Sequence, residues 1–386
     1  MTTESDWRSS LSSSDRYDNI QAIKAALEKA NTSISQSNAF TIENEAYKIS
    51  ASRAEYDETC RKIPGQETST PTQALNASTE QDVPQSPGIT IGSYRNCHYV
   101  ASGVTAEVYR SKAVALKVIV ETRNMEPHDP FREARILERL KKPCIPLLET
   151  FRDQEQRFTL AFPFMPMSLE SLIEKGTIPR NRVRKHFTEI FKALDYIHQQ
   201  GIIHRDIKPS AILLESIDGP AYLSDFGTAW HPELSVFTEP ADSKILDIGT
   251  GPYRSPEALF GDKSYGTSVD MWGAGTMLAE CCRNTPRPLF ESRAAHEDGN
   301  QLGLILSIFK TIGSPTRESW PEAATFKTPP FDMYQVFEGQ TWENILPDVD
   351  EDFRELIVSL VVYNTKIRAT AAQALRFKCM LDPIQE

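Results

Sequence analysis

Apolar positions form short strand-like runs in the segment that begins near Tyr99. These runs cover residues 99–100, 107–109 and 114–119, and the last of them is almost continuously apolar. Aromatic and β-branched residues in short runs of this kind are typical of strands that face a core. The pattern therefore predicts the first strands of a small sheet.

Farther along the chain, apolar residues recur at the spacing of a helix. Residues 131–140 carry them at positions that share one side, which predicts a helix with one buried face. After Phe162 the pattern is largely helical, and residues 183–198 and 269–280 give the clearest helices. We therefore expect an α+β fold with two lobes, a small β-rich N-lobe followed by a larger helical C-lobe.

The first part of the chain has a different composition. Residues 1–92 are rich in Ser, Thr, Asn, Gln and Glu and have few large apolar side chains. Such a segment buries too little surface to offset its backbone entropy, so we expect it to be mostly disordered. Residues 15–30 form the exception, since their apolar spacing predicts a short amphipathic helix that is either transient or a docking helix. Thr70 and Ser86 each precede a proline and are either phosphorylation sites or chance matches.

The length of 386 residues fits one folded domain with an extension. We assign residues 1–92 to a disordered or partly helical N-terminal extension. The folded domain then covers residues 93–382, with an N-lobe over about 93–162 and a C-lobe over about 166–382.

Charge and cysteine usage narrow the class of protein. The net charge of −11 argues against a general nucleic-acid binder, which needs clustered cations to displace counterions. The six cysteines lack a CxxC spacing, so they indicate reduced thiols rather than disulfides or a metal site. No apolar run approaches the roughly 20 residues that a membrane helix needs, and the N-terminus is not a secretory signal. We expect an intracellular monomer, in the nucleus, the cytoplasm or both.

Two motifs carry most of the chemistry. The sequence HRDIKP occupies residues 204–209, and DFG occupies 225–227, nineteen residues after Asp206. Phosphoryl transfer from a nucleotide depends on positioned carboxylates and cations rather than on a covalent nucleophile. In this order and spacing, Asp206 would accept or orient the proton of a substrate hydroxyl, and Lys208 would stabilise the transferring phosphoryl group. Asp225 would supply a hard oxygen ligand for Mg²⁺.

Lys117 and Glu133 fit the same chemistry. Lys117 lies in the apolar run at 114–119, where it would reach the α and β phosphates of a nucleotide. Glu133, in the helix expected over 131–140, is the natural ion-pair partner that would hold Lys117 in place. A lone lysine in a strand is usually a solvated charge, but the two downstream motifs favour the catalytic interpretation.

The candidate phosphate loop is weak. Three glycines would be expected, yet the chain keeps only Gly103, with Ala101 and Ala106 at the flanking places. Alanine adds a Cβ atom where glycine permits close approach of the backbone to phosphate. Val108 and Lys117, which follow this loop, support a nucleotide site more strongly than the loop itself.

From about Tyr99 to the C-terminus, the chain resembles the eukaryotic protein kinases. The sequence GTGPYRSPEALFG at 249–261 is similar to the end of the activation segment in the branch that contains the cyclin-dependent kinases. The sequences at 308–315 and 320–321 resemble an insert peculiar to that branch. The resemblance implies ATP and Mg²⁺ as cofactors and a protein substrate, and Lys208 indicates transfer to serine or threonine.

The resemblance also assigns residues outside the two motifs. It implies that Thr250 contacts the substrate and that Glu257 pairs with Arg368 in the interior. Ala115 would lie against the adenine, and backbone groups around Phe164 and Met165 would hydrogen-bond it, although Pro163 departs from the usual hinge sequence.

Within this branch, the chain looks most like the single-subunit fungal kinases that activate cyclin-dependent kinases. The degenerate glycine loop supports that likeness, and the helix bearing Glu133 lacks the usual cyclin-recognition sequence. We therefore expect a cell-cycle kinase whose substrate is a cyclin-dependent kinase, and no cyclin partner.

The segment between Asp225 and Glu257 contains several hydroxyl and acidic side chains. They are Ser235, Thr238, Ser243, Glu233, Glu239 and Asp242. One hypothesis is that an acidic residue pairs with Arg205 in place of a phosphate, which would make the kinase active without phosphorylation. The alternative is that these charges only solvate a loop.

Ala211 departs from the family pattern. It stands where the family carries an asparagine that binds a magnesium ion and steadies Asp206. Three functions stay open. The chain is a slow kinase that uses a single Mg²⁺ or Mn²⁺, or a pseudokinase that presents its surface to a partner, or a structural interaction protein built around the N-terminal extension.

Overall fold

The computed structural model describes most of the chain after residue 87 and a few residues before it. The described residues are 88–103, 105–120, 126–292, 301–331 and 335–381, together with Asn19, Ile23, Ala46, Tyr47, Ser50 and 52–61. The chain divides into two compact units, Met1–Asp82 and Val83–Glu386. In the first unit, helix α3 covers Arg53–Arg61. The helix expected over residues 15–30 lies outside the described residues apart from Asn19 and Ile23, and Thr70 and Ser86 lie outside them as well.

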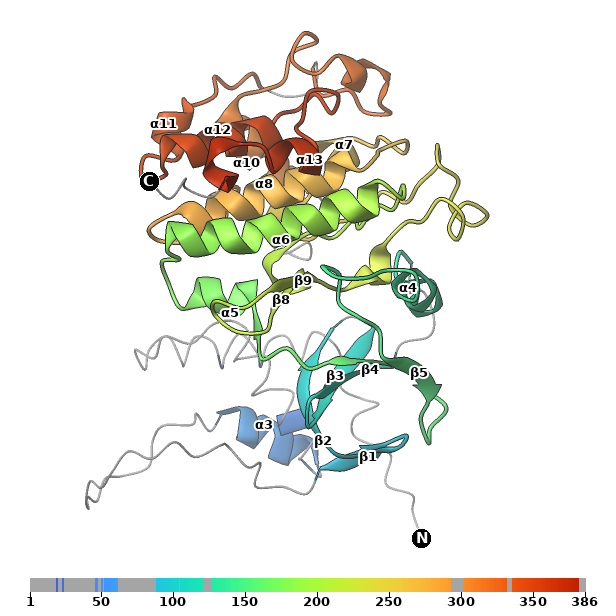
Figure 1. The fold of residues 1–386 in the computed structure, drawn as a ribbon. Helices are drawn as coiled ribbons and strands as arrows, with labels where there is room; N and C mark the ends of the chain where they lie inside the picture. Colours follow the sequence, from blue (N-terminus) through green and yellow to red (C-terminus); the bar gives the residue numbers. More distant parts are fainter. Residues whose placement is uncertain are drawn as a thin grey trace, which may run out of the picture. The chain divides into compact units, whose positions relative to one another are not determined.

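The small lobe of the second unit is a six-stranded antiparallel sheet with the order β1-β2-β3-β4-β6-β5 (Figure 1). Its strands are β1 Ile89–Ile91, β2 Tyr94–Ser102, β3 Ala106–Ser111, β4 Val114–Ile119, β5 Glu149–Arg152 and β6 Phe158–Pro163. The strands expected at 99–100, 107–109 and 114–119 are therefore confirmed. Leu116 and Val118 of β4 are fully buried, so the apolar run at the centre of the sheet forms the core of this lobe.

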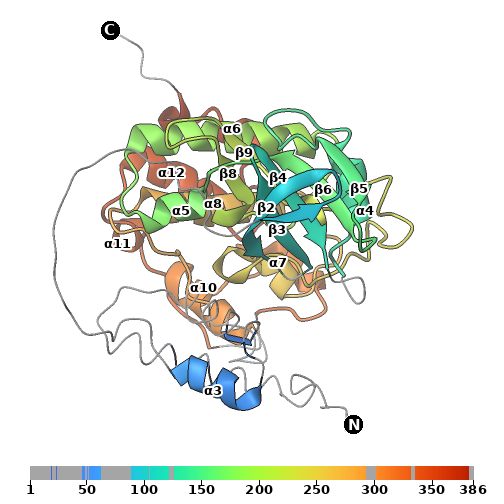
Figure 2. The ribbon, with the colours of Figure 1, turned by 90° about the horizontal axis from the view of Figure 1, so that it is seen from below.

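One helix, α4 (Pro130–Leu137), lies beside the sheet in both views (Figures 1 and 2). Ala134 of this helix packs with buried residues of β4 and β6. The helix is shorter than the predicted range of 131–140, because the chain continues after Leu137 in tighter turns of the i to i+3 type. Phe131, expected on the buried face, is 51% exposed and stacks on Phe158 with ring centroids 4.5 Å apart.

The large lobe is mainly helical, as expected. Its α-helices are α5 Leu169–Glu174, α6 Arg180–His198, α7 Pro256–Leu259, α8 Ser268–Cys282, α10 Leu302–Ile312, α11 Trp342–Ile345, α12 Glu351–Leu360 and α13 Ala371–Ala374. Short 3₁₀ helices are η2 Pro209–Ala211, η3 Phe226–Thr228, η4 Gly251–Tyr253, η5 Pro321–Thr325 and η6 Lys378–Met380. Helix α8 is buried at every position from Val269 to Cys282, so it forms the axis around which the lobe packs.

A second, three-stranded antiparallel sheet joins the helices to the candidate site. It consists of β7 Met167–Ser168, β8 Ile212–Leu214 and β9 Ala221–Leu223, in that order. The motif HRDIKP comes directly before η2 and β8, and Asp225 comes two residues after β9. Because β8 and β9 are hydrogen-bonded neighbours, the two motif loops are held side by side.

The six cysteines are all buried. Within the described residues, no helix is both long enough and apolar enough to cross a membrane. In the same part of the chain, no cluster of three or more His, Cys, Asp or Glu side chains is arranged to hold a metal ion.

Candidate functional site

An ion-pair cluster joins β4, α4 and the DFG loop. Lys117 Nζ contacts both oxygens of Glu133, at 2.8 and 2.9 Å, and Oδ1 of Asp225 at 3.0 Å. Burial alone would lower the pKa of Lys117, but the charges of Asp225 and Glu133 outweigh it and raise that pKa. Lys117 in turn lowers the pKa of Asp225 well below its usual range. The predicted Lys117–Glu133 pair is therefore present, and Asp225 is ionised at neutral pH.

Asp129 positions α4 and was missed in the sequence. Its carboxylate caps the helix by accepting hydrogen bonds from the backbone N–H groups of Phe131 and Arg132, at 3.0 and 2.9 Å. Its own N–H donates to the carbonyl of Gly227 at 2.9 Å. Asp followed by Pro before an apolar periodic run is a known start signal for a helix, so the sequence carried this information. One residue thus ties the helix that bears Glu133 to the DFG loop.

Replacing Asp129 with alanine should lower the free energy of unfolding by about 0.5–2 kcal/mol, because two N–H groups at the start of α4 lose their acceptor. Urea unfolding followed by circular dichroism would measure this. The asparagine side chain of the matched variant Asp129→Asn can still cap the helix, so that variant should lose much less. Equal losses in the two variants would show that the cap is not the cause.

The loop that contains HRDIKP is hydrogen-bonded to Asp270 at the start of α8. Asp270 accepts hydrogen bonds from the backbone N–H groups of His204 and Arg205, at 2.9 and 2.8 Å. The ring of His204 lies edge-on to Phe226, with centroids 4.9 Å apart, and its Nε2 lies 2.8 Å from the carbonyl oxygen of Ser224. Phe226 thus packs on His204, and Asp270 braces the backbone that precedes Asp206. The two motif loops therefore pack directly against each other.

Asp206 stands between a cation and a hydroxyl group. Its Oδ2 lies 2.6 Å from Lys208 Nζ, and its Oδ1 accepts a hydrogen bond of 2.6 Å from the hydroxyl of Thr250. Lys208 also donates to the Thr250 oxygen at 3.1 Å. The structure thus brings together three residues from two distant parts of the sequence. Chemically, this carboxylate can take a proton from a hydroxyl, and the adjacent ammonium group can stabilise a transferring anion.

Ala211 contributes only backbone to the site. It is buried, and its carbonyl accepts hydrogen bonds from both the N–H and the hydroxyl of Ser224, each at 2.9 Å. By contrast, the side chain of Asp225 is 42% exposed, so it can ligate an ion while Lys117 binds one of its oxygens. The donor set fits Mg²⁺ with Asp225 as the protein ligand, and position 211 offers no side-chain ligand for a second ion.

The sheet gathers the predicted nucleotide-binding side chains on one face. Val108 of β3 pairs with Lys117 of β4, and Ala115 lies two residues from Lys117, so all three side chains project to the same side. Ala101 pairs with Val108 near the turn between β2 and β3. At this turn the N–H of Gly103 donates to the carbonyl of Ala106 at 2.8 Å.

Gly103 lies in a backbone conformation that other residues adopt. Apart from its chain neighbours, the nearest described atom to a Cβ built at this position would be the carbonyl oxygen of Ala106, at 3.8 Å. The hairpin therefore forms without needing glycine here, in keeping with the loss of glycine at the two flanking positions.

In the hinge, the backbone N–H groups of Phe164 and Met165 differ in their availability for hydrogen bonds to a base. The N–H of Phe164 donates to the carbonyl of Ala113 at 2.8 Å, and the guanidinium of Arg110 lies 4.1 Å from the Phe164 ring centre. The amide of Phe164 is therefore already committed to the protein. The N–H group of Met165 therefore stays the predicted hydrogen-bond donor to a base.

The end of the activation segment is anchored in the interior. Arg368 contacts both oxygens of Glu257, at 2.6 and 3.1 Å, and neither side chain is exposed. The predicted pairing of these residues is present. The anchor fixes α7 and, through it, the preceding residues that carry Thr250.

Comparison with known proteins gives consistent matches. The sequence model described as "Protein kinase domain" matches residues 94–380. The chain is 34% identical over 279 residues to the serine/threonine-protein kinase csk1 of Schizosaccharomyces pombe, which covers 69% of this chain and 88% of csk1. It is 31% identical over 297 residues to cyclin-dependent kinase 7 of Xenopus laevis, covering 73% of this chain and 80% of the relative. The identity to cyclin-dependent kinase 7 of Carassius auratus is also 31%, over 300 residues, covering 74% and 82%.

Proposed function

Because the chain belongs to the serine/threonine protein kinases, in the branch related to the cyclin-dependent kinases, we propose that it phosphorylates the activation segment of a cyclin-dependent kinase. The observation that carries the catalytic part of this proposal is the contact of Asp206 with both Lys208 and Thr250. This contact brings together Asp206 as a proton acceptor, Lys208 as a cation for the transferring group, and Thr250 of the proposed substrate-binding segment. A substrate of this kind implies that the protein works in the nucleus, the cytoplasm or both.

In this proposal each residue has one task. Lys117, held by Glu133, would bind the α and β phosphates of the nucleotide, and Asp225 would hold the metal ion. When bound, ATP and Mg²⁺ supply the phosphoryl group and neutralise its charge. Asp206 orients the substrate hydroxyl and takes its proton, while Lys208 stabilises the charge that develops on the transferring group.

The proposal that the chain works without a cyclin rests on the sequence and on the state of α4. The Lys117–Glu133 pair is already formed in the isolated chain, at 2.8 Å. A kinase that needed a cyclin to move this helix would gain that pair only in the complex. The formed pair therefore supports a kinase that works as a single chain, as expected for the single-subunit activating kinases.

The experiment that tests the substrate measures transfer of labelled γ-phosphate from ATP to an inactive cyclin-dependent kinase and to a generic basic protein. The control is the same cyclin-dependent kinase with its activation-segment threonine replaced by alanine. A preference for the intact substrate that disappears with the alanine substrate would support the proposal. Efficient labelling of the basic protein alone would leave a kinase with a different substrate.

A second function, a pseudokinase, is favoured by the absence of a side-chain ligand at position 211. If transfer is limited by this ligand, Ala211→Asn should raise the rate by about 30- to 1,000-fold, because one electrostatic contact of about 2–4 kcal/mol is restored. The rate would be measured with Mg²⁺ and with Mn²⁺. Ser210→Asn places the same amide one residue away and should give no gain.

The outcomes separate the two functions. Measurable transfer by the wild type, increased in Ala211→Asn, describes a slow kinase. No wild-type transfer with either metal, and activity only in Ala211→Asn, describes a pseudokinase silenced at this ligand. If the variant gains nothing over an active wild type, the ligand at position 211 is not limiting.

A further inference from the structure

Arg205, directly before Asp206, combines an uncommon backbone conformation with a buried, hydrogen-bonded side chain. Arg205 has a φ of 73°, in the left-handed region that residues other than glycine seldom adopt. Its side chain is buried and contacts a carboxylate oxygen of Glu239, the carbonyl of Thr228 and the hydroxyl of Tyr265. Any rearrangement of these contacts would therefore act on the residue that precedes the proposed base.

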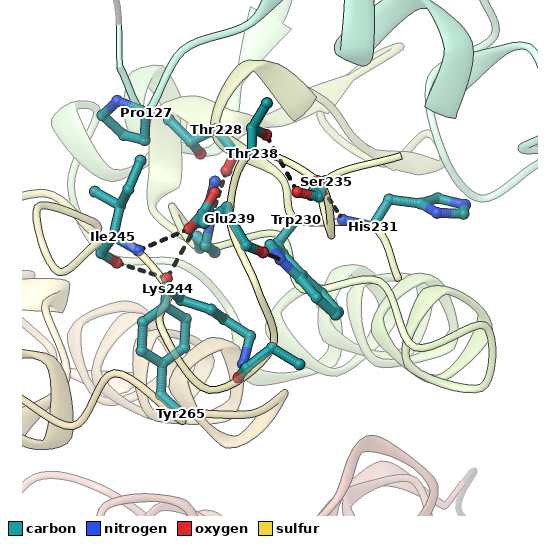
Figure 3. Close-up of polar contacts among 12 residues, drawn as sticks. Pro127, Thr228, Trp230, His231, Ser235, Thr238, Glu239, Lys244, Ile245 and Tyr265 are labelled. Atoms are coloured by element: carbon teal, nitrogen blue, oxygen red, sulfur yellow. Dashed lines mark hydrogen bonds and ion pairs between the residues drawn. The ribbon is translucent and has the colours of Figure 1, made fainter. Parts of the chain in front are cut away.

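Glu239 is itself fastened on several sides (Figure 3). The carboxylate oxygen that meets Arg205 also accepts a hydrogen bond of 2.8 Å from the N–H of Ile245. The Glu239 carbonyl accepts one of 2.9 Å from the indole of Trp230. Tyr265 donates to the Ile245 carbonyl at 2.7 Å, and Lys244 Nζ lies 4.9 and 5.2 Å from the ring centres of Trp230 and Tyr265. The acidic side chain thus fixes the segment that contains it as well as the catalytic loop.

A second buried cation, Arg132, belongs to the same charged neighbourhood. Arg132, the neighbour of Glu133 on α4, is 8% exposed and donates to the carbonyl of Pro127 at 2.7 Å. Burial and the charge of Arg205 lower the pKa of Arg132, while the carboxylates of Asp129, Glu239 and Glu126 act against this. Buried cations without a compensating anion are strongly destabilising, so two buried arginines require negative charge near them. Glu239 supplies the direct ion pair to Arg205, and Asp129 and Glu126 add negative charge around Arg132.

The other acidic residues of the segment do not reach this place. Glu233 pairs with Arg139 at 2.9 Å, and both side chains are largely exposed. Asp242 is exposed. Of the three candidates recognised in the sequence, only Glu239 is buried against Arg205.

We propose that Glu239 is a positioning residue whose carboxylate takes the place of an activating phosphate. Protein kinases commonly order this segment by pairing a phosphorylated side chain with arginines. Here a carboxylate of the chain makes that pairing and holds Arg205, and with it Asp206, in the arrangement for transfer. The inference rests on the kinase activity proposed above but not on the identity of the substrate.

Three buried polar atoms around Arg205 and Glu239 indicate where a phosphate could compete with the Glu239 carboxylate. Arg132 Nε, Arg205 Nη2 and Glu239 Oε2 are buried without hydrogen-bond partners among the described residues. A phosphate on a nearby hydroxyl would have oxygens for these nitrogens. Thr238 is exposed and adjacent to Glu239, whereas Ser235 is fully buried and its oxygen accepts from the N–H of His231. Thr238 is therefore the site at which phosphorylation would compete with this proposal.

The test uses the full chain with a generic basic protein as substrate, so that it does not depend on the cyclin-dependent-kinase assignment. The purified protein is treated with phosphatase, its intact mass is checked, and kcat and KM are measured. We expect unchanged activity after treatment. Glu239→Gln should lower kcat by about 100-fold with little change in the KM for ATP, since it disturbs positioning rather than nucleotide binding.

Two matched variants separate positioning from a general loss of structure. Glu239→Asp keeps the charge and should recover part of the activity. Glu233→Gln removes a charge from the same segment at an exposed pair, and should behave as the wild type. If Glu239→Gln does not fold, the Glu239→Asp variant and the phosphatase treatment still decide the question.

Several outcomes would overturn the proposal. One is loss of wild-type activity on phosphatase treatment, with recovery when Thr238 is phosphorylated again. Another is a folded Glu239→Gln variant with wild-type kcat. If the wild type transfers no phosphate to any substrate, the proposed function fails on its own, and the Glu239 variants are then compared in an Ala211→Asn background. Equal activity with and without Glu239→Gln in that background would refute the positioning role.

Discussion

Replacing Asp206 with asparagine should reduce phosphoryl transfer by about 100- to 10,000-fold, the range typical of removing a general base. The amide of asparagine has nearly the shape of the carboxylate, so the hydrogen bond from Thr250 can remain. It cannot take a proton, however, and it loses the ion pair of 2.6 Å with Lys208. The effect should therefore fall on kcat, with the KM for ATP nearly unchanged. Initial rates with labelled ATP would measure both constants.

The matched control for this variant is Asp195→Asn. Asp195 lies on α6 and accepts a hydrogen bond of 2.7 Å from Gln199 at an exposed position. It has the same chemistry as Asp206 but no place in the site, so its variant should keep wild-type activity. A folded Asp206→Asn variant that transfers phosphate at nearly the wild-type rate would exclude Asp206 as the proton acceptor.

Replacing Arg368 with methionine should destabilise the large lobe by about 3–5 kcal/mol, because it leaves the buried Glu257 carboxylate without its partner. Both side chains of the pair are fully buried, and Arg368 also donates to the carbonyl of Ser268 at 2.8 Å. Methionine fills similar volume but cannot supply these donors. Since Arg368 lies 5.1 Å from the ring centre of Trp272, tryptophan fluorescence during urea unfolding is a suitable measurement.

A double variant tests the cause of that loss. Combining Arg368→Met with Glu257→Gln removes both charges, so it should be less destabilised than Arg368→Met alone. Lys192→Met breaks an exposed pair with Glu189 at 2.9 Å and should have little effect. If the double variant loses the sum of the two single losses, the unpaired charge is not what destabilises the lobe.

The sequence predicted local structure best where the apolar pattern was strong. The run at 114–119 became the buried strand β4, and 183–198 and 269–280 lie within α6 and α8. The end of α4 was predicted less well. Spacing alone placed Phe131 in the core, whereas the shorter helix leaves that ring on the surface against Phe158. Helical periodicity does not say how far a helix extends once its turns tighten.

A contact in the candidate site could be predicted where both of its residues belong to recognisable sequence motifs. Lys117, Glu133 and Asp206 belong to such motifs, and the pair formed by the first two is present. The contact of Asp206 with Thr250 needed the structure, because the two residues are 44 positions apart. The choice of Glu239 over Glu233 also needed it, since both are acidic residues of one segment and only burial separates them.

Because all six cysteines are buried, labelling of their thiols can measure how often the surrounding structure opens transiently. Alkylating reagents attack thiolates, and burial shields these groups. It also raises the pKa of the Cys97 and Cys281 thiols and raises that of Cys144 to about 12. Modification of the native protein therefore requires part of the chain to open first. Cys97 lies in the small lobe and Cys281 in the axis of the large lobe. The rates at which the two thiols become labelled would compare how often each lobe opens, without introducing any foreign probe.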